Sequence, residues 1–156
     1  MPLESALRQT ALAQAGAAST QVAGVILYRL PQFRDFRGLL SVAEAGGQIP
    51  FEIKRFFLVS DVSSAEIRGE HAHRTLYQFL VCVHGSCEVI ADDGENRQSF
   101  LLGDPSVAVL LPPMVWAVQH RFSPDAVLLV LASEKYDPGE YIRDYGEFLK
   151  MVRAPL

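Results

Sequence analysis

The sequence predicts an all-β domain, a sandwich or barrel of short strands, closed by a single helix near the C-terminus. From residue 24 onward, short apolar or alternating runs are separated by Gly, Pro, Asp and Asn at intervals of about 8–12 residues. Two of these runs flank DDGEN (92–96), a strong hairpin signal because Asp-Gly supplies the positive φ values that a tight turn requires. Near the end of the chain the apolar spacing becomes that of a helix.

The chain begins with a segment that does not resemble the rest. Residues 1–22 are rich in Ala, Gln, Ser and Thr and lack a strong apolar stripe. We therefore expect a flexible tail over 1–22, without a function of its own, followed by one domain over 23–156.

The strands of the domain follow one another without an internal repeat or a second-domain boundary. They are expected at residues 24–30, 39–44, 51–61, 67–73, 76–84, 86–92, 97–102, 107–111, 115–122 and 126–133. The intervening segments, including PQFRDFRG (31–38), are expected to be turns and connections.

The closing helix is predicted from DPGEYIRDYGEFLKMV (137–152). Asp137 would be its N-cap and Pro138 would occupy the first helical position. Apolar residues then recur at helical spacing, at Tyr141, Tyr145, Phe148 and Val152. We expect this aromatic stripe to pack on the barrel.

Composition bounds the function. The 156 residues are 49% apolar and 21% charged, which is typical of a single globular domain. The net charge of −4 and the absence of a Lys/Arg run argue against a nucleic-acid partner. Apolar runs such as VAVLLPPMVWAV are too short or too broken to span a bilayer, so no membrane association is expected. A cytoplasmic protein with reduced Cys82 and Cys87 is the expectation.

The segment RGEHAHRTLYQFLVCVHG (68–85) contains three of the four histidines, and two of them, His71 and His73, are separated by a single residue. Alternate residues of a strand project to the same face, so both rings are expected to point into the barrel. Several other polar residues lie close by, and buried polar groups require partners or a polar ligand. Imidazole can move a proton at neutral pH, so we interpret the pair as an acid/base site, with a structural polar cluster as the alternative.

A His-x-His pair entering a β-barrel is also the start of the cupin metal motif. The spacing fits that motif, but the later donors do not. Gln78 stands where the motif has Glu, and the fourth-ligand position falls on Ala117 or Val118. Two donors of four do not hold a metal ion, so neither a metal nor another cofactor is expected, although His120 lies three residues beyond Ala117.

Three longer segments carry a family resemblance: IPFEIKRFFLVSDV (49–62), RGEHAHRTLYQFLVCVHGSCEVIADDG (68–94) and VLASEKYDPGEYIRDYGEF (130–148). Together they resemble the cupin-fold nucleotide-sugar 3,4-ketoisomerases, which also occur as C-terminal domains of WxcM-like proteins. The likeness runs from about Val25 to Val152. It implies an RmlC-like jelly-roll β-barrel, a metal-free isomerase, and a homodimer that exchanges strands between its subunits.

The implied reaction converts dTDP-4-oxo-6-deoxyglucose to a 3-oxo sugar through an enediolate, for 3-amino-3,6-dideoxy sugars of surface glycans. By the resemblance, one of His71 and His73 removes the C3 proton, and the other donates a proton or binds the oxyanion; their order stays open. Arg68 of the same motif would stabilise the enediolate or a phosphate. A salt bridge to Glu66 or Glu70 is the alternative role of Arg68.

Weaker candidates complete the expected site. Gln78 would bind a sugar hydroxyl, while Arg55 and Trp116 would contact the pyrophosphate and the base or sugar, with surface charge or packing as their alternative.

The resemblance implies that family members often carry a tyrosine, whose hydroxyl would be catalytic, in the strand after IKR, where this chain has Phe56 and Phe57. Tyr77 or water would then have to supply the missing hydroxyl. The configuration of the product at C4 therefore stays open.

Two other functions are compatible with the fold. A dTDP-sugar 3,5-epimerase uses one His base and a Tyr acid, and the HAH pair without that tyrosine favours the ketoisomerase. A non-catalytic sugar-nucleotide-binding cupin is the second. A metal-dependent dioxygenase would need metal donors that the motif lacks.

Overall fold

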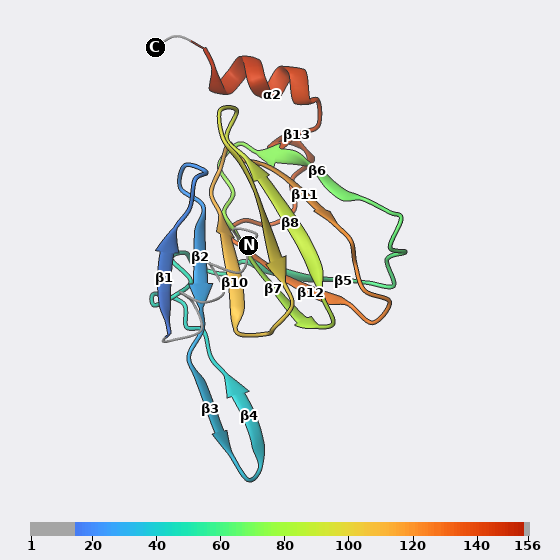
Figure 1. Ribbon diagram of the computed structural model, residues 1–156. Coiled ribbons are helices and arrows are strands. Elements are labelled where there is room, and N and C mark those ends of the chain that lie inside the picture. The colour runs from blue at the N-terminus through green and yellow to red at the C-terminus, as the bar shows by residue number, and fades with distance from the viewer. Residues whose placement is uncertain (1–14, 155–156) are drawn as a thin grey trace.

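The computed structural model describes residues 15–154 as two antiparallel β-sheets that face each other, with a short helix across one end (Figure 1). The six-stranded sheet has the order β1-β2-β10-β7-β12-β5, and the five-stranded sheet has the order β13-β6-β11-β8-β9. Many short strands in two facing sheets make the jelly-roll barrel that the sequence predicts.

The strands are short and follow the turn residues closely. The six-stranded sheet contains β1 (Gly16–Ser19), β2 (Ile26–Arg29), β5 (Arg55–Ser60), β7 (Gln78–His84), β10 (Val107–Leu111) and β12 (Val127–Ala132). The five-stranded sheet contains β6 (Arg68–His73), β8 (Cys87–Asp92), β9 (Arg97–Leu102), β11 (Trp116–His120) and β13 (Tyr141–Ile142).

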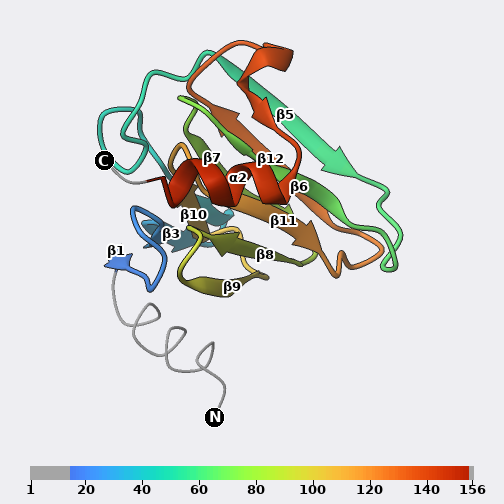
Figure 2. The ribbon, with the colours of Figure 1, turned by 90° about the horizontal axis from the view of Figure 1, so that it is seen from above.

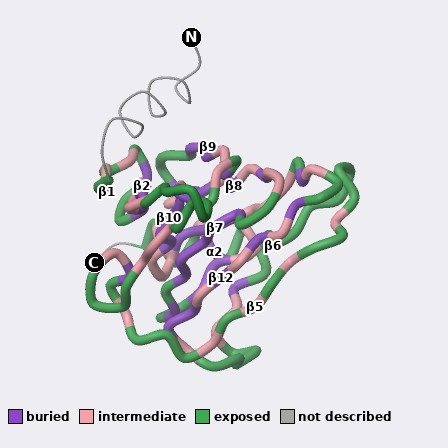
Figure 3. The backbone as a smooth tube through the Cα atoms, turned by 90° about the horizontal axis from the view of Figure 1, so that it is seen from below, coloured by how far each residue is buried: buried purple, intermediate pink, exposed green. Residues whose placement is uncertain are grey.

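The main core fills the space between the sheets, where alternate residues of facing strands meet. The central strand β7 contributes Leu80 and Cys82 to this core, and its other face packs Phe79 and Val81 into a second cluster. Figure 3 shows the buried positions running along β7 and β12, with exposed positions in the loops and along β5. Cys82 and its neighbour Cys87 are buried free thiols.

The β8–β9 hairpin turns at the predicted Asp-Gly. Gly94 has φ of 96°, which favours glycine, and an added Cβ would lie 2.5 Å from Cγ2 of Val152. The turn therefore requires glycine both for its backbone and for the close approach of the C-terminal helix.

The C-terminal segment differs from the single helix predicted from Asp137. Asp137 caps only one 3-10 turn, Pro138–Glu140, after which Tyr141 enters β13. The helix α2 (Tyr145–Val152) starts from a second cap, where the Asp144 carboxylate accepts a hydrogen bond from the Glu147 N–H at 2.8 Å. Tyr141 is thus not part of a helical stripe, because strand β13 separates the two caps.

Helix α2 lies across one end of the barrel (Figures 1 and 2). Its buried Phe148 packs against Trp116, Ala72 and Ile142. The hydroxyl of Tyr145 donates a hydrogen bond of 2.8 Å to the buried Asp92 carboxylate. No helix in residues 15–154 is long and apolar enough to cross a membrane.

Two further strands were not predicted. The segment expected as a connection forms β3 (Gln32–Asp35), which pairs with β4 (Gly38–Ser41) in a hairpin that extends away from the barrel (Figure 1). The end of the expected tail forms β1, and Val22 is buried in the core. The rest of that tail, residues 1–14, lies outside the described residues.

Candidate active site

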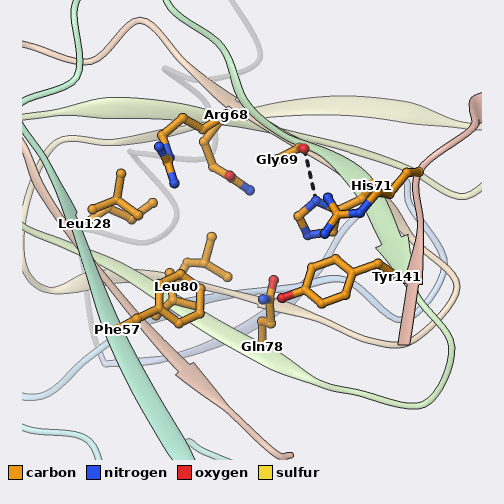
Figure 4. Close-up of a pocket in the computed structure, with 12 residues that line it drawn as sticks. Phe57, Arg68, Gly69, His71, Gln78, Leu80, Leu128 and Tyr141 are labelled. Carbon is orange, nitrogen blue, oxygen red and sulfur yellow. Dashed lines mark hydrogen bonds between the residues drawn. The ribbon is translucent and has the colours of Figure 1, made fainter. Parts of the chain in front are cut away.

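A cavity of about 260 Å³ lies between the two sheets (Figure 4). One wall comes from β5, β7 and β12 and is largely apolar; the other comes from β6, β11 and the β13 segment and is largely polar. The first wall consists of Phe57, Val59, Gln78, Leu80, Leu128 and Val130, and the second of Arg68, Gly69, His71, Gln119, Tyr141 and Arg143. The described lining thus includes two arginines and no carboxylate.

Strand β6, which carries both histidines, is bulged just before them. Gly69 and Glu70 have left-handed φ values of 84° and 56°, and the pairing of β6 with β11 shifts register at Ala117/Val118. Bulges of this kind re-aim the neighbouring side chains. Gly69 is required here, because an added Cβ would lie 2.8 Å from the carbonyl oxygen of Ala117.

The carbonyl oxygen of Gly69 fixes the ring of His71, which lies 3.0 Å away through its Nδ1 (Figure 4). A carbonyl can only accept, so Nδ1 carries the proton, and Nε2 of the neutral ring is the basic atom. Burial lowers the pKa of His71; the Gly69 hydrogen bond opposes this, and the Arg143 cation adds to it. His71 is therefore neutral at pH 7, as a general base must be.

His73 is buried behind the cavity wall rather than on it. Its ring centroid lies 4.8 Å from that of His71 and 4.7 Å from that of Tyr141. Burial and the neighbouring His71 lower the pKa of His73 to about 4. Neither ring nitrogen has a hydrogen-bond partner within the described part of the chain. The pair therefore lies together as predicted, but only His71 lines the cavity.

Arg68 and Gln78 lie where the sequence analysis expected them, on opposite walls of the cavity. Among the ion pairs of residues 15–154, none joins Arg68 to Glu66 or Glu70. The guanidinium of Arg68 is thus available to an anion. Gln78 is a buried amide, and its side chain lies beside the Tyr141 hydroxyl in Figure 4.

Sequence reasoning missed three polar residues of the cavity, Tyr141, Arg143 and Gln119. Tyr141 lies opposite His73 in the β13–β6 pair, and the guanidinium carbon of Arg143 lies 4.4 Å from its ring centroid. One signal could have found Tyr141. Asp144 followed three residues later by Glu147 is itself a helix-start pattern, and it places the preceding residues outside the helix.

Two predicted substrate-binding residues lie elsewhere. Trp116 packs beneath helix α2, with its ring centroid 5.7 Å from that of Phe148. Tyr77 is partly exposed, and its ring lies 6.3 Å from that of Phe51. Neither residue lines the cavity: Trp116 projects from β11 toward helix α2, and Tyr77 lies in the segment before β7.

Arg55 lies at the edge of the site without lining the cavity. Its guanidinium carbon is 5.3 Å from the ring centroid of Phe57, which does line it, and 5.6 Å from that of Tyr136. Its Nε and Nη2 are buried and have no hydrogen-bond partner among the described residues.

The donor set does not fit a cupin metal centre. Ala117, at the fourth-ligand position, lies directly opposite His71 in the β11–β6 pair and brings only a methyl group. His120 lies 3.3 Å from the carboxylate of Glu88 through its Nε2 and does not line the cavity. In residues 15–154 no group of three or more His, Cys, Asp or Glu is arranged to hold a metal ion.

The arrangement suits proton transfer at a carbon next to a carbonyl. His71 offers a basic Nε2, Arg68 and Arg143 offer positive charge for the anion that results, and Gln78 and Tyr141 offer hydrogen bonds. These are the groups needed to form and hold an enediolate.

The comparisons agree with this chemistry. Residues 23–153 match the family described as FdtA: WxcM-like, C-terminal. A TDP-4-oxo-6-deoxy-α-D-glucose 3,4-oxoisomerase from Aneurinibacillus thermoaerophilus is 47% identical over 118 residues, which are 76% of this chain and 85% of that relative.

Solved structures resemble the fold closely. A 3,4-ketoisomerase from Helicobacter canadensis has a TM-score of 0.80 at 41% identity, over 83% of this chain and 97% of that one. A histidine variant of the 3,4-ketoisomerase QdtA from Thermoanaerobacterium thermosaccharolyticum, in complex with TDP-4-keto-6-deoxyglucose, has a TM-score of 0.82 at 34% identity, over 85% and 96%. A 4-keto-6-deoxy sugar epimerase from Streptomyces spheroides shares the fold alone, at 21% identity and a TM-score of 0.73. The chain therefore belongs to the FdtA family, the WxcM-like C-terminal domains with the cupin fold.

Proposed function

We propose that this chain is a 3,4-ketoisomerase that converts TDP-4-oxo-6-deoxyglucose to its 3-oxo isomer. The observation that carries the proposal is His71, a neutral imidazole with a free Nε2 on a cavity with two arginines and no carboxylate in its described lining. Such a cavity favours both a phosphorylated ligand and an anionic intermediate. By their names, the relatives act on or bind this sugar nucleotide.

The reaction needs no redox partner, because one sugar carbon is oxidised as its neighbour is reduced. A base removes the C3 proton, the C–H electron pair becomes the C3=C4 bond, and the carbonyl π pair moves onto O4. A proton then adds to C4 while O3 gives up its own proton and becomes the new carbonyl. One base and a pocket that stabilises the enediolate are sufficient for this exchange.

The roles follow from position. His71 is the base at C3, because its basic Nε2 belongs to the ring that lines the cavity. His73 is the second acid/base group, through its contact with His71. Arg68 stabilises the charge that develops on O4, and Gln78 binds a sugar hydroxyl. Arg55, whose buried Nε and Nη2 have no hydrogen-bond partner among the described residues, is proposed to meet the pyrophosphate.

We also propose that the protein works as a dimer with exchanged strands, and that the β3–β4 hairpin is the exchanged element. The hairpin extends away from the barrel, so its large apolar side chains are exposed to solvent in the single chain. They are Phe33, Phe36, Leu39 and Leu40. A hairpin with no core of its own is stabilised by covering these side chains against a second copy.

The proposed setting is the cytoplasm, where the two buried free thiols Cys82 and Cys87 fit a reducing compartment. The product, a 3-oxo sugar nucleotide, suits a following amine transfer to C3 that gives a 3-amino-3,6-dideoxy sugar.

The test is incubation with TDP-4-oxo-6-deoxyglucose in D2O, followed by NMR. The expected result is a 3-oxo sugar nucleotide with deuterium at C4. Exchange at both C3 and C5 without a 3-oxo product would identify a 3,5-epimerase instead. Binding with no exchange at C3, by protein shown to be folded, would identify a non-catalytic binding protein and overturn the proposal.

A further inference from the structure

We propose that the hydroxyl of Tyr141 carries the proton that moves between the two sugar oxygens, O3 and O4. This inference rests on the proposed ketoisomerase reaction and assigns a catalytic residue for it. It replaces Tyr77, which the sequence analysis offered as the source of a hydroxyl and which the structure places outside the cavity.

The isomerisation moves two protons of different kinds. The first kind is bound to carbon: the base removes a proton from C3 and a proton is added at C4. The second kind is bound to oxygen: a proton leaves the hydroxyl oxygen O3 and O4 gains one. The second transfer needs a group that can donate and accept a proton at nearly the same place, because O3 and O4 lie on one edge of the enediolate.

Tyr141 is placed for this role. Its ring centroid lies 4.8 Å from that of His71, and its hydroxyl points into the cavity toward Gln78 (Figure 4). The pairing of β13 with β6 sets Tyr141 directly opposite His73, and the Arg143 guanidinium lies 4.4 Å from the ring centroid. The phenol and the base thus come to the same end of the cavity from neighbouring strands.

The other lining groups do not meet the requirement. The amides of Gln78 and Gln119 make hydrogen bonds but are neither acids nor bases. The guanidinium groups of Arg68 and Arg143 donate hydrogen bonds but do not act as bases in proteins. Phe57, on the opposite wall, has no hydroxyl. Apart from the base His71, Tyr141 is the one ionisable side chain of the described lining that can both give and take a proton.

The proposed step balances. As His71 removes the C3 proton and O4 becomes negative, the Tyr141 hydroxyl gives its proton to O4 and leaves a phenolate. The phenolate then takes the proton from O3 as the C3–O3 bond becomes a carbonyl. The electron pair of the C3=C4 bond takes a proton at C4 from the His71 imidazolium, which returns His71 to its neutral form. Tyr141 ends the cycle with its hydroxyl restored.

The experiment compares Tyr141→Phe with wild type and with Tyr136→Phe in D2O. Tyr136 is the matched control, since its ring lies 5.9 Å from that of Tyr141 but does not line the cavity. We expect Tyr141→Phe to lose at least about 10²-fold in formation of the 3-oxo product, as for the loss of a general acid/base group. Deuterium should still enter C3 of the recovered substrate, because His71 can remove and return that proton without the phenol. Tyr136→Phe should match wild type in both readouts.

Two outcomes would overturn the proposal. Unchanged product formation by Tyr141→Phe would mean that water carries the oxygen proton. An equal fall in product formation and in C3 exchange, with the melting temperature unchanged, would mean that the ring only positions His71. If wild type itself gives neither exchange nor product, the proposed function fails first.

Discussion

The carbonyl oxygen of Gly69 lies 3.0 Å from Nδ1 of His71, two residues later in the same bulged strand. This contact places the proton on Nδ1 and so makes Nε2 the basic atom of the ring. It also depends on the backbone at Gly69, whose φ of 84° is favourable only to glycine. The position of the proposed base is therefore set by a residue that bears no side chain.

Replacing Gly69 by Ala should thus damage both the site and the fold. The new Cβ would lie 2.8 Å from the backbone oxygen of Ala117, and the left-handed φ adds strain of roughly 1–3 kcal/mol. We expect a lower free energy of unfolding in urea and a loss of activity even where the variant remains folded. Gly16→Ala is the matched control, because no atom lies within 4 Å of its Cβ position. Equal activity of the two variants would contradict this role of Gly69.

The two histidines can be separated by isotope exchange. His71→Asn and His73→Asn are each expected to lose at least about 10²-fold in turnover, the low end for general acid/base groups. Only His71→Asn should also lose deuterium exchange at C3, because His71 is the ring on the cavity wall. His84→Asn, at an exposed position near the end of β7, should retain full activity. Exchange that survives in His71→Asn but disappears in His73→Asn would reverse the two roles.

The pH dependence of stability should report His73. Its pKa falls from 6.5 to about 4 on folding, so the unfolded chain binds more protons between these values. The stabilisation of the fold that depends on neutral His73 is fully present above pH 6.5. It is lost as the pH falls toward 4, which lowers the free energy of unfolding by up to about 3 kcal/mol. Urea unfolding of wild type and His73→Asn over this range should show a flatter profile for the variant. The same slope in both proteins would mean that other groups cause the loss.

Helix α2 should depend on the buried carboxylate of Asp92. Burial alone would raise the pKa of Asp92, but hydrogen bonds from the Gly94 N–H, the Tyr145 hydroxyl and Arg97 leave it below its usual value. Replacing Asp92 by Ala leaves those donors without their acceptor, which should cost about 1–3 kcal/mol of unfolding free energy. Glu95→Ala, in the exposed turn of the same hairpin, should cost well under about 1 kcal/mol. Similar losses in both variants would show that Asp92 does not anchor the helix.

The sequence predicted the parts of the site that follow from strand alternation. His71 and Gln78 reach the cavity from the strand faces that alternation gives them, whereas Arg68 has the opposite parity to His71 and reaches the cavity through the bulge at Gly69 and Glu70. Tyr141 was missed because helical spacing continues through a segment in which strand β13 separates two Asp-capped elements. The apolar spacing alone cannot reveal such a break, because the break depends on the pairing of β13 with β6, in which Tyr141 lies opposite His73, 68 residues earlier in the chain.

The errors at Trp116 and Tyr77 have the same physical origin. Each was chosen for its chemistry, without knowledge of the face of the sheet to which it projects. Along β11, Ala117 and Gln119 project to the face between the sheets, whereas Trp116 and Val118 project to the other face, so Gln119 lines the cavity and Trp116 packs under the helix. Of the β3–β4 hairpin, β4 overlaps the strand expected at 39–44, whereas β3 was missed because its residues are mostly exposed and do not alternate between a buried and an exposed face.

That hairpin leads to the last prediction, on oligomeric state. If its exposed apolar face is covered by a second copy, the protein should sediment as a dimer, and Phe36→Asp combined with Leu40→Asp should shift it toward monomer. Phe36 is 98% exposed and Leu40 is 59% exposed, so neither substitution disturbs the core of the described chain. Met151→Asp, at an exposed apolar position of α2, controls for the added charge and should remain dimeric. A wild-type monomer at micromolar concentration, or a double variant that stays dimeric, would remove the hairpin as the exchanged element. A dimer that needs the hairpin would also explain why a segment with so many apolar residues persists outside the barrel, because its side chains are buried only in the assembly.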